Sequence, residues 1–216
     1  MLTRSLAKLG VLCVLGLLAV GTTTAAADTT VVFDTGDGTF HPEPVNGTAR
    51  PTSGGPATLT LSGLGTITCG SANFTAQFTT TTGAPAAAQL TALTFTSCTD
   101  TVPVITFSSC HLDGTAPAIA ITASGTAGGT FAMGATTVRC GVSGTTSACY
   151  YQATAPVGTW VNSPSSLSFS GAALLHTVPG GTTGDLGSLC GTTGSESFSL
   201  GHAVNEQNRT LTIRDP

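Results

Sequence analysis

The chain has 216 residues, of which only 7% are charged, and its ten acidic residues outnumber six basic ones. Four arginines and no lysine follow residue 27, so ten acids against four arginines give a formal charge of −6 beyond that point. A nucleic-acid binder needs a basic face to displace counterions from phosphates, and an anionic membrane surface makes the same demand, so both partner classes are excluded.

Residues 1–27 have the pattern of a secretory signal peptide. Arg4 and Lys8 supply a positive start, an apolar run covers 9–20, and three alanines at 25–27 provide the small residues of a cleavage site. A membrane anchor is the alternative, but the apolar run is shorter than the roughly 20 residues that cross a bilayer. We therefore expect a secreted protein, free outside the cell or associated with the cell wall, with no membrane span after cleavage.

Residues 28–56 combine one short strand over 30–33 with a surface loop rich in proline and glycine. Proline cannot donate to a strand ladder, so the loop is not expected to pair regularly. Asp34, Asp37 and Glu43 in this segment form a candidate Ca²⁺ site, because that ion prefers oxygen ligands. Their spacing does not match an EF-hand, and a solvated acidic loop is the alternative interpretation.

Asp34 also lies in the run Val-Val-Phe-Asp-Thr-Gly over 31–36, which resembles the catalytic loop of pepsin-like aspartic proteases. The chemistry of those enzymes needs two carboxylates that share one proton. The chain has no second Asp-Thr-Gly or Asp-Ser-Gly, and Asp37 stands where a Ser or Thr usually follows. A secreted hydrolase that uses Asp34 is therefore kept as an alternative function, beside the simpler interpretation of a strand that ends in a turn.

Residues 57–216 alternate apolar and polar side chains in short runs, which is the period of a half-buried β-strand. Leu59 and Leu61, for example, share one face of their run. Turn residues recur at roughly 8 to 12 residue intervals, the spacing of a sandwich. The one helical candidate, 172–176, is shorter than a stable helix. We predict a single all-β domain over 57–216, an antiparallel β-sandwich or jelly roll of about a dozen short strands.

Six of the seven cysteines follow the leader, and an even number in a secreted chain predicts three disulfides. A short hairpin is expected to bring Cys140 and Cys149 together. Cys69 and Cys98 each close one half of an antiparallel strand run and are expected to clip it, and the third pair follows by elimination. The predicted bonds are therefore Cys69–Cys98, Cys140–Cys149 and Cys110–Cys190. A zinc site at Cys110 and His111 is the alternative, but no Cys-x-x-Cys accompanies these residues.

Tyr150, Tyr151 and Trp160 are candidate ligand-binding residues. Adjacent residues on a strand point to opposite faces, so one tyrosine is expected to face outward. Together with Trp160 on a neighbouring strand, it would form a flat platform on which a sugar ring stacks. The alternative is that Trp160 fills the core and one tyrosine lies at its edge.

The order of these features resembles a group of small secreted, disulfide-bonded β-sandwich proteins of actinobacteria with no assigned activity. A fainter likeness extends to secreted activators of alkane oxidation. The resemblance implies a fold, secretion and a bacterial source, and it assigns no functional residue. The segments that carry it are TITC (66–69), LTFTSC (93–98), CYYQATAPVGTWVN (149–162) and, near the end, LC, SFSL and LTI.

The sequence contains no complete catalytic constellation and few ionisable groups, whereas threonine and serine are abundant. It therefore favours a secreted, non-catalytic binding or structural protein that needs no cofactor and no metal. The expected partner is an extracellular ligand, either cell-wall polysaccharide or a surface protein. A carbohydrate-binding module and a hydrolase using Asp34 are the alternatives.

Overall fold

The computed structural model of the chain describes residues 28–35, 37, 39–52, 54–163, 165–178, 184–201 and 203–215. The expected signal peptide, 1–27, therefore lies outside the described residues, as does Gly36 of the Asp-Thr-Gly run. Within the described ranges the protein is all-β, with seventeen strands and one short 3-10 helix. Every pairing between these strands is antiparallel, as the sequence predicts, although the strands outnumber the dozen expected.

The strands of the first half of the chain are β1 (Thr29–Asp34), β2 (Phe40–Pro42), β3 (Thr48–Pro51), β4 (Gly55–Leu61), β5 (Gly65–Thr80), β6 (Thr82–Gly83), β7 (Ala86–Asp100) and β8 (Phe107–Asp113). The remaining elements are β9 (Ala118–Ala123), β10 (Gly128–Met133), β11 (Thr136–Val142), β12 (Ala148–Ala153), β13 (Val157–Asn162), β14 (Ser165–His176), the 3-10 helix η1 (Gly187–Cys190), β15 (Thr193–Ser199), β16 (Ala203–Val204) and β17 (Leu211–Arg214).

Alternation of apolar and polar residues explains the long strands. In β5 the side chains of Phe74 and Phe78 are buried, while Gln77, which lies between them in the sequence, is exposed. The helical candidate at 172–176 is the end of β14, where Leu174 is buried and Leu175 is exposed. Burial that alternates from one residue to the next fits a strand, whereas a helix would bury residues three or four positions apart, so β14 is extended here.

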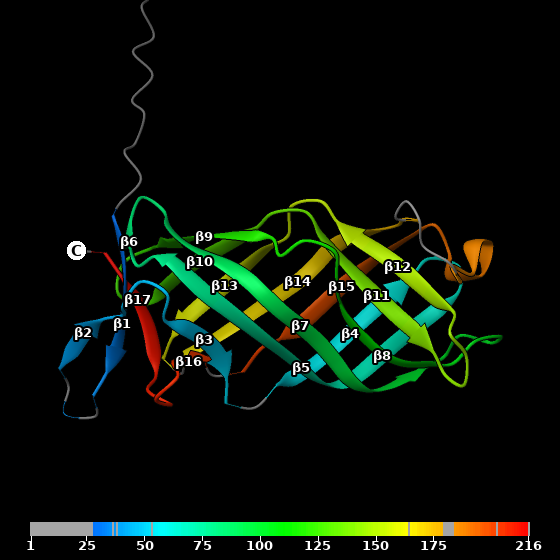
Figure 1. Ribbon diagram of the computed structural model, residues 1–216, viewed down its shortest axis with the longest axis horizontal. Helices are drawn as coiled ribbons and strands as arrows, with labels where there is room; N and C mark the ends of the chain where they lie inside the picture. Colours follow the sequence, from blue (N-terminus) through cyan, green and yellow to red (C-terminus); the bar gives the residue numbers. More distant parts are fainter. Residues whose placement is uncertain are drawn as a thin grey trace, which may run out of the picture.

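The main sheet of 13 strands closes on itself. Beyond its linear order, β5 pairs with β7 and β12 pairs with β14, so the path β4–β5–β7–β8–β11–β12–β14–β15 returns to β4. A second path leaves β7 through β9, β10 and β13 and also reaches β14. The result is an elongated closed sheet (Figure 1). Its opposite walls face each other across one core, as the two layers of a β-sandwich do.

Two half-walls share the long strands β7 and β14. One half-wall consists of β9, β10 and β13, and the other consists of β8, β11 and β12; Figure 1 shows the first on the left and the second on the right. The chain crosses between them through the connections 114–117, 134–135 and 154–156. Among the described residues no strand of one half-wall pairs with a strand of the other, and we call the line between the half-walls the seam.

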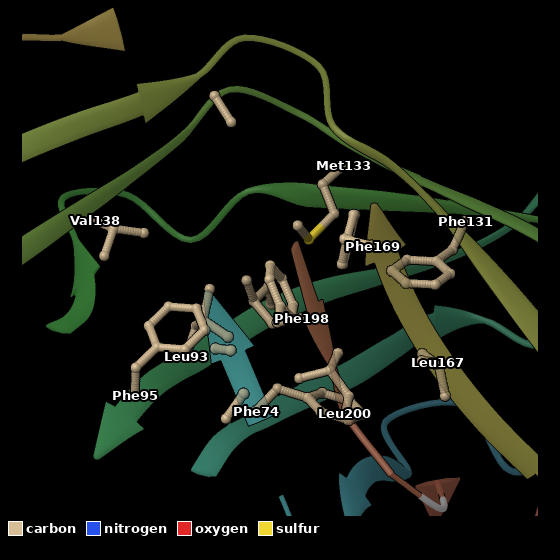
Figure 2. Close-up of a cluster of buried hydrophobic side chains, with 14 of the residues drawn as sticks. Phe74, Leu93, Phe95, Phe131, Met133, Val138, Leu167, Phe169, Phe198 and Leu200 are labelled. Carbon is tan, nitrogen blue, oxygen red and sulfur yellow. The ribbon is translucent and has the colours of Figure 1, made fainter. Parts of the chain in front are cut away.

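Aromatic rings in the core connect the two halves of the closed sheet. Phe95 packs edge-on against Phe198 at 5.3 Å between centroids, Phe198 lies 4.6 Å from Phe169, and Phe169 lies 4.6 Å from Phe131. Figure 2 shows Phe198 in the middle of this row, with Phe95 to one side and Phe131 to the other. The Phe131 ring fits because its strand partner is Gly158, where a Cβ would lie 2.3 Å from the ring.

A small sheet covers one end of the closed sheet. It consists of β17, β1 and β2 in that order, with β6 beside β1, and it lies at the left end in Figure 1. Val31 of β1 and both Leu211 and Ile213 of β17 are fully buried and join the main core. The buried side of this sheet therefore acts as an apolar cap over that end.

Three disulfides are present, and one of the three predicted pairs is confirmed. Cys69 is bonded to Cys98 across the β5–β7 pair, as predicted. The other two predictions are wrong, because the bonds are Cys110–Cys140 and Cys149–Cys190 rather than Cys140–Cys149 and Cys110–Cys190.

The error has a simple geometric origin. Cys140 lies directly opposite Cys149 on β12, as the hairpin argument requires, but it also lies directly opposite Cys110 on β8. Hairpin proximity therefore does not choose between the two neighbours. Cys190 lies in η1, which packs beside β12, and it bonds Cys149 there. Cys140 is then left to Cys110.

Candidate functional site

The seam holds a pocket at each of its ends. Beside β7, a pocket of about 210 Å³ opens where β8 and β9 part; its lining includes Thr91, Thr94 and His111. Beside β14, a pocket of about 320 Å³ is lined by 154–157 and 170–173. The first of these pockets offers more kinds of polar group to a ligand, because its lining includes an imidazole as well as hydroxyl groups.

A row of polar side chains runs outward from the first pocket across five adjacent strands. Asn73 of β5 lies opposite Thr94 of β7, Thr94 lies opposite His111 of β8, and His111 lies opposite Arg139 of β11, which faces Tyr150 of β12. Paired residues of antiparallel strands share one face of the sheet. Their neighbours Phe74, Phe95, Cys110 and Cys140 are buried, so the row lies on the outer face.

A second, shorter row lies beside the first. Asp113 of β8 is opposite Thr137 of β11, and Thr137 is opposite Gln152 of β12. The side-chain amide of Gln152 donates a hydrogen bond to the Thr137 hydroxyl at 3.4 Å. We call the two rows together the polar patch, which comprises Asn73, Thr94, His111, Asp113, Thr137, Arg139 and Gln152. The patch extends about 19 Å from β5 to β12, because neighbouring strands lie about 4.8 Å apart.

The charges of the polar patch are not consumed by ion pairs. Arg139 donates from Nε to the Tyr150 hydroxyl at 3.3 Å and from a terminal nitrogen to the Thr146 carbonyl at 3.3 Å, and it has no carboxylate partner within the described residues. In the same part of the chain the His111 and Asp113 side chains have no hydrogen-bond partner either. The patch thus offers a ligand hydrogen-bond donors, hydrogen-bond acceptors and side chains of both charges.

The outer face of the other half-wall is different in kind. Thr122, Thr130 and Thr159 lie opposite one another on β9, β10 and β13, and Ser168 of β14 continues the row. This row presents hydroxyl groups only. It gives a comparison surface of similar geometry without the imidazole, guanidinium and carboxylate of the polar patch.

The predicted aromatic platform is wrong. Trp160 points into the core, is 2% exposed and lines an apolar cavity of about 30 Å³ in the core. Tyr151 is also inside, and its hydroxyl donates to the Cys190 carbonyl at 2.9 Å. Tyr150 does face the outer side, as one tyrosine was expected to, but it is 4% exposed and Arg139 packs over it. No flat ring surface therefore reaches solvent from these three residues.

The predicted Ca²⁺ ligands do not share one environment. Glu43 is buried, and its carboxylate accepts from the Asn205 amide at 3.1 Å, whereas Asp37 is exposed and accepts from the Thr39 amide at 2.9 Å. Burial raises the pKa of Glu43, while hydrogen bonds, chiefly from Thr35, lower the pKa of Asp37 to about 2. Asp34 ends β1 opposite Phe40. In the described ranges, the one group of three ligating side chains with donor atoms close together lies elsewhere.

Sequence reasoning missed the polar patch, although a signal for it was present. His111 and Asp113 alternate with Cys110 and Leu112, and Arg139 directly precedes Cys140. Had the Cys110–Cys140 bond been predicted, the antiparallel register would have placed His111 opposite Arg139. The wrong disulfide therefore concealed the patch.

Three comparisons with known proteins returned no match: no protein-family model, no curated protein and no solved structure is similar to this chain. Over the described residues, no helix combines the length and the apolar character needed to cross a membrane. The three disulfides fit an extracellular protein, because such bonds persist in oxidising surroundings.

Proposed function

We propose that the protein is a secreted, non-catalytic binding protein whose polar patch holds a neutral carbohydrate. One observation carries the proposal: in a chain with 7% charged residues, an imidazole, a guanidinium and a carboxylate meet on one outer face beside a pocket. Each sugar hydroxyl can donate one hydrogen bond and accept others, so sugars suit a surface on which hydrogen-bond donors and acceptors lie close together.

The balance of charge in the patch favours a neutral ligand over an ionic one. Arg139 and Asp113 contribute one charge of each sign, on neighbouring strands of the same face. A polyanion would be repelled by the Asp113 carboxylate, and a polycation would be repelled by the Arg139 guanidinium, so either ligand would bind less tightly. The length of the patch, about 19 Å from the strand spacing, suits an oligosaccharide segment better than a single sugar.

The test is co-sedimentation of the oxidised chain with isolated cell walls and with insoluble neutral polysaccharides. The double variant His111→Ala, Asp113→Ala removes the two ionisable groups of the polar patch whose side chains have no hydrogen-bond partner among the described residues. We expect it to weaken binding by at least about tenfold, since each hydrogen bond to a charged group contributes about 1.5–3 kcal/mol. The matched control, Thr130→Ala with Thr159→Ala, lies on the outer face of the other half-wall and should bind normally.

Two outcomes would overturn the proposal. If no polysaccharide brings the protein into the pellet, carbohydrate binding is wrong and a protein partner becomes the next hypothesis. If both double variants lose binding equally, the patch is not the binding surface. Release of soluble sugar that Asp34→Asn abolishes would favour the hydrolase alternative instead.

A further inference from the structure

A cluster of metal-ligand side chains lies at the end of the closed sheet opposite the small sheet. His176 is the last residue of β14, Asp185 bridges to Ala148 before η1, and Cys190 ends η1, which is the orange coil at the right of Figure 1. One donor atom from each of these three residues lies within 4.8 Å of the others. Cys149 adjoins the cluster, because its sulfur is bonded to that of Cys190.

The surrounding contacts hold these side chains in place. His176 Nε2 lies 3.1 Å from an Asp185 carboxylate oxygen, which is hydrogen-bond distance. The other Asp185 oxygen accepts from the Gly187 amide at 2.6 Å, and Tyr151 fixes the Cys190 backbone through its hydroxyl. The His176 and Asp185 side chains are 12% and 8% exposed, and Cys190 is fully buried. The cluster is thus ordered and largely shielded from water.

We propose that this cluster is a redox-gated site for Zn²⁺ or a similar divalent ion. A dithiol reductant opens the Cys149–Cys190 bond: the two sulfurs take up two electrons and two protons, and the reductant becomes a cyclic disulfide. The metal then displaces protons from both thiols. It is held by the two thiolates, the His176 imidazole and the Asp185 carboxylate, a four-coordinate set of sulfur, nitrogen and oxygen donors of the kind that zinc takes.

The geometry needs only small adjustments to reach this state. Tetrahedral zinc with these ligands places donor atoms roughly 3.3–3.8 Å apart, as follows from Zn–S of about 2.3 Å and Zn–N of about 2.0 Å. The donor atoms of His176, Asp185 and Cys190 already lie within 4.8 Å of one another. The Cys149 sulfur, the fourth donor, is bonded to Cys190 and must turn toward the ion after that bond opens. The disulfide and the metal ion are therefore alternative cross-links for the same end of the protein.

The other disulfides lack this surrounding. Cys110 neighbours His111 in sequence, but the Cys110 sulfur is buried in the core while His111 lies on the outer face. Adjacent residues of a strand point to opposite sides, so the sequence neighbours do not meet. Within the described residues, the cluster of His176, Asp185 and Cys190 is the one group of its kind.

The experiment uses Cys149→Ala, which frees the Cys190 thiol while leaving the other two disulfides intact. Titration with Co²⁺ reports thiolate ligation through a sulfur-to-metal charge-transfer absorption. We expect this band in Cys149→Ala, its absence in the oxidised wild type, and at least about a 100-fold loss of affinity in Cys149→Ala, His176→Ala, since even outer-shell partners of a metal ligand cost 10–100-fold.

Each remaining outcome decides the proposal. A folded Cys149→Ala without the band would overturn it, as would an equal band in the His176→Ala double variant. If Cys149→Ala folds only when Zn²⁺ is present, the proposal is supported, because metal binding then supplies folding free energy. If it folds in neither case, the wild type is reduced with a dithiol in the presence of Co²⁺, and a missing band there overturns the proposal.

Discussion

Glu196 lies directly opposite Leu59 in the β15–β4 pair, on the inner face of the closed sheet. The side chain is 3% exposed, it neighbours Phe198 along the same face, and its Oε2 atom has no hydrogen-bond partner in the described part of the protein. Burial raises the pKa of Glu196 from 4.5 to about 7. An acid in this position stays protonated well above the pH at which it ionises in the unfolded chain.

This buried acid makes stability depend on pH. A carboxyl whose pKa is higher in the folded state binds its proton more tightly there, so the contribution of Glu196 to stability is greatest below about pH 4.5. It should fall by roughly 3 kcal/mol as the pH rises to about 7, and it should stay low above that value. Glu196→Gln should remove this loss, because a neutral amide has no charge to desolvate.

Urea denaturation at several pH values between about 4 and 8 checks the prediction. Glu43 is also buried with a raised pKa, so the difference between the variant and the wild type isolates Glu196 from that second acid. Glu206→Gln changes an exposed acid and serves as the matched control. A Glu196→Gln curve parallel to that of the wild type would contradict the pKa assigned here.

Asn205 stabilises the turn before β17 and the Glu43 carboxylate at the same time. Its Nδ2 donates to Glu43, and its Oδ1 accepts from the amides of Gln207 and Arg209. Asn205→Ala leaves the buried Glu43 carboxylate without this amide donor and removes the acceptor of the two turn amides, and we expect a loss of about 1–3 kcal/mol in the free energy of unfolding. Thermal unfolding followed by circular dichroism measures the loss, with Gln207→Ala, at an exposed position of the same turn, as control. Equal stability of the two variants would mean that Asn205 is only a space filler.

Trp160 is a core residue in this structure, so its truncation should affect stability and not recognition. Trp160→Ala should cost about 3–5 kcal/mol, the usual range for a buried tryptophan. Denaturant unfolding monitored by circular dichroism gives this value. Trp160→Phe keeps most of the volume, and polysaccharide binding by this folded variant should equal that of the wild type. Loss of binding without loss of stability would restore the platform hypothesis.

The disulfide connectivity has a direct chemical test. Cleavage before aspartates 100, 113 and 185 separates Cys110, the pair of Cys140 and Cys149, and Cys190 onto three fragments. The bonds found here join all three fragments into one species under non-reducing conditions. The connectivity inferred from the hairpin would instead join the first fragment to the third and leave 113–184 separate. Mass spectrometry distinguishes the two results.

The all-β character and the Cys69–Cys98 bond could be predicted because both follow from local alternation. β5 and β7 form one long antiparallel pair, and Cys69 faces Cys98 within it. Closure of the sheet could not be predicted in this way. It depends on β7 pairing with β9 near Ala87 and with β8 near Phe95, and no periodicity in β7 marks that exchange of neighbours.

The candidate site was beyond sequence reasoning for a related reason. Its groups come from strands that lie far apart along the chain, with Asn73 and Gln152 at its two ends. Three cysteines on neighbouring strands leave two equally close partners for Cys140, so the register that gathers the polar patch was not recoverable from spacing. Trp160 was misjudged because an aromatic residue near tyrosines has the same sequence pattern in a core as on a platform.

The pairing of β1 with β17 also bears on how the chain folds. Thr30 pairs with Arg214, so the first and last described strands meet in one small sheet. Val31 and Ile213 cannot bury each other until the chain from β1 through β17 is present. Contacts between such distant residues close late and slowly, because a long loop must be ordered first. We therefore expect the apolar end of the main sheet to stay uncovered until β17 docks, so the pairing of β17 with β1 is the step that covers that end.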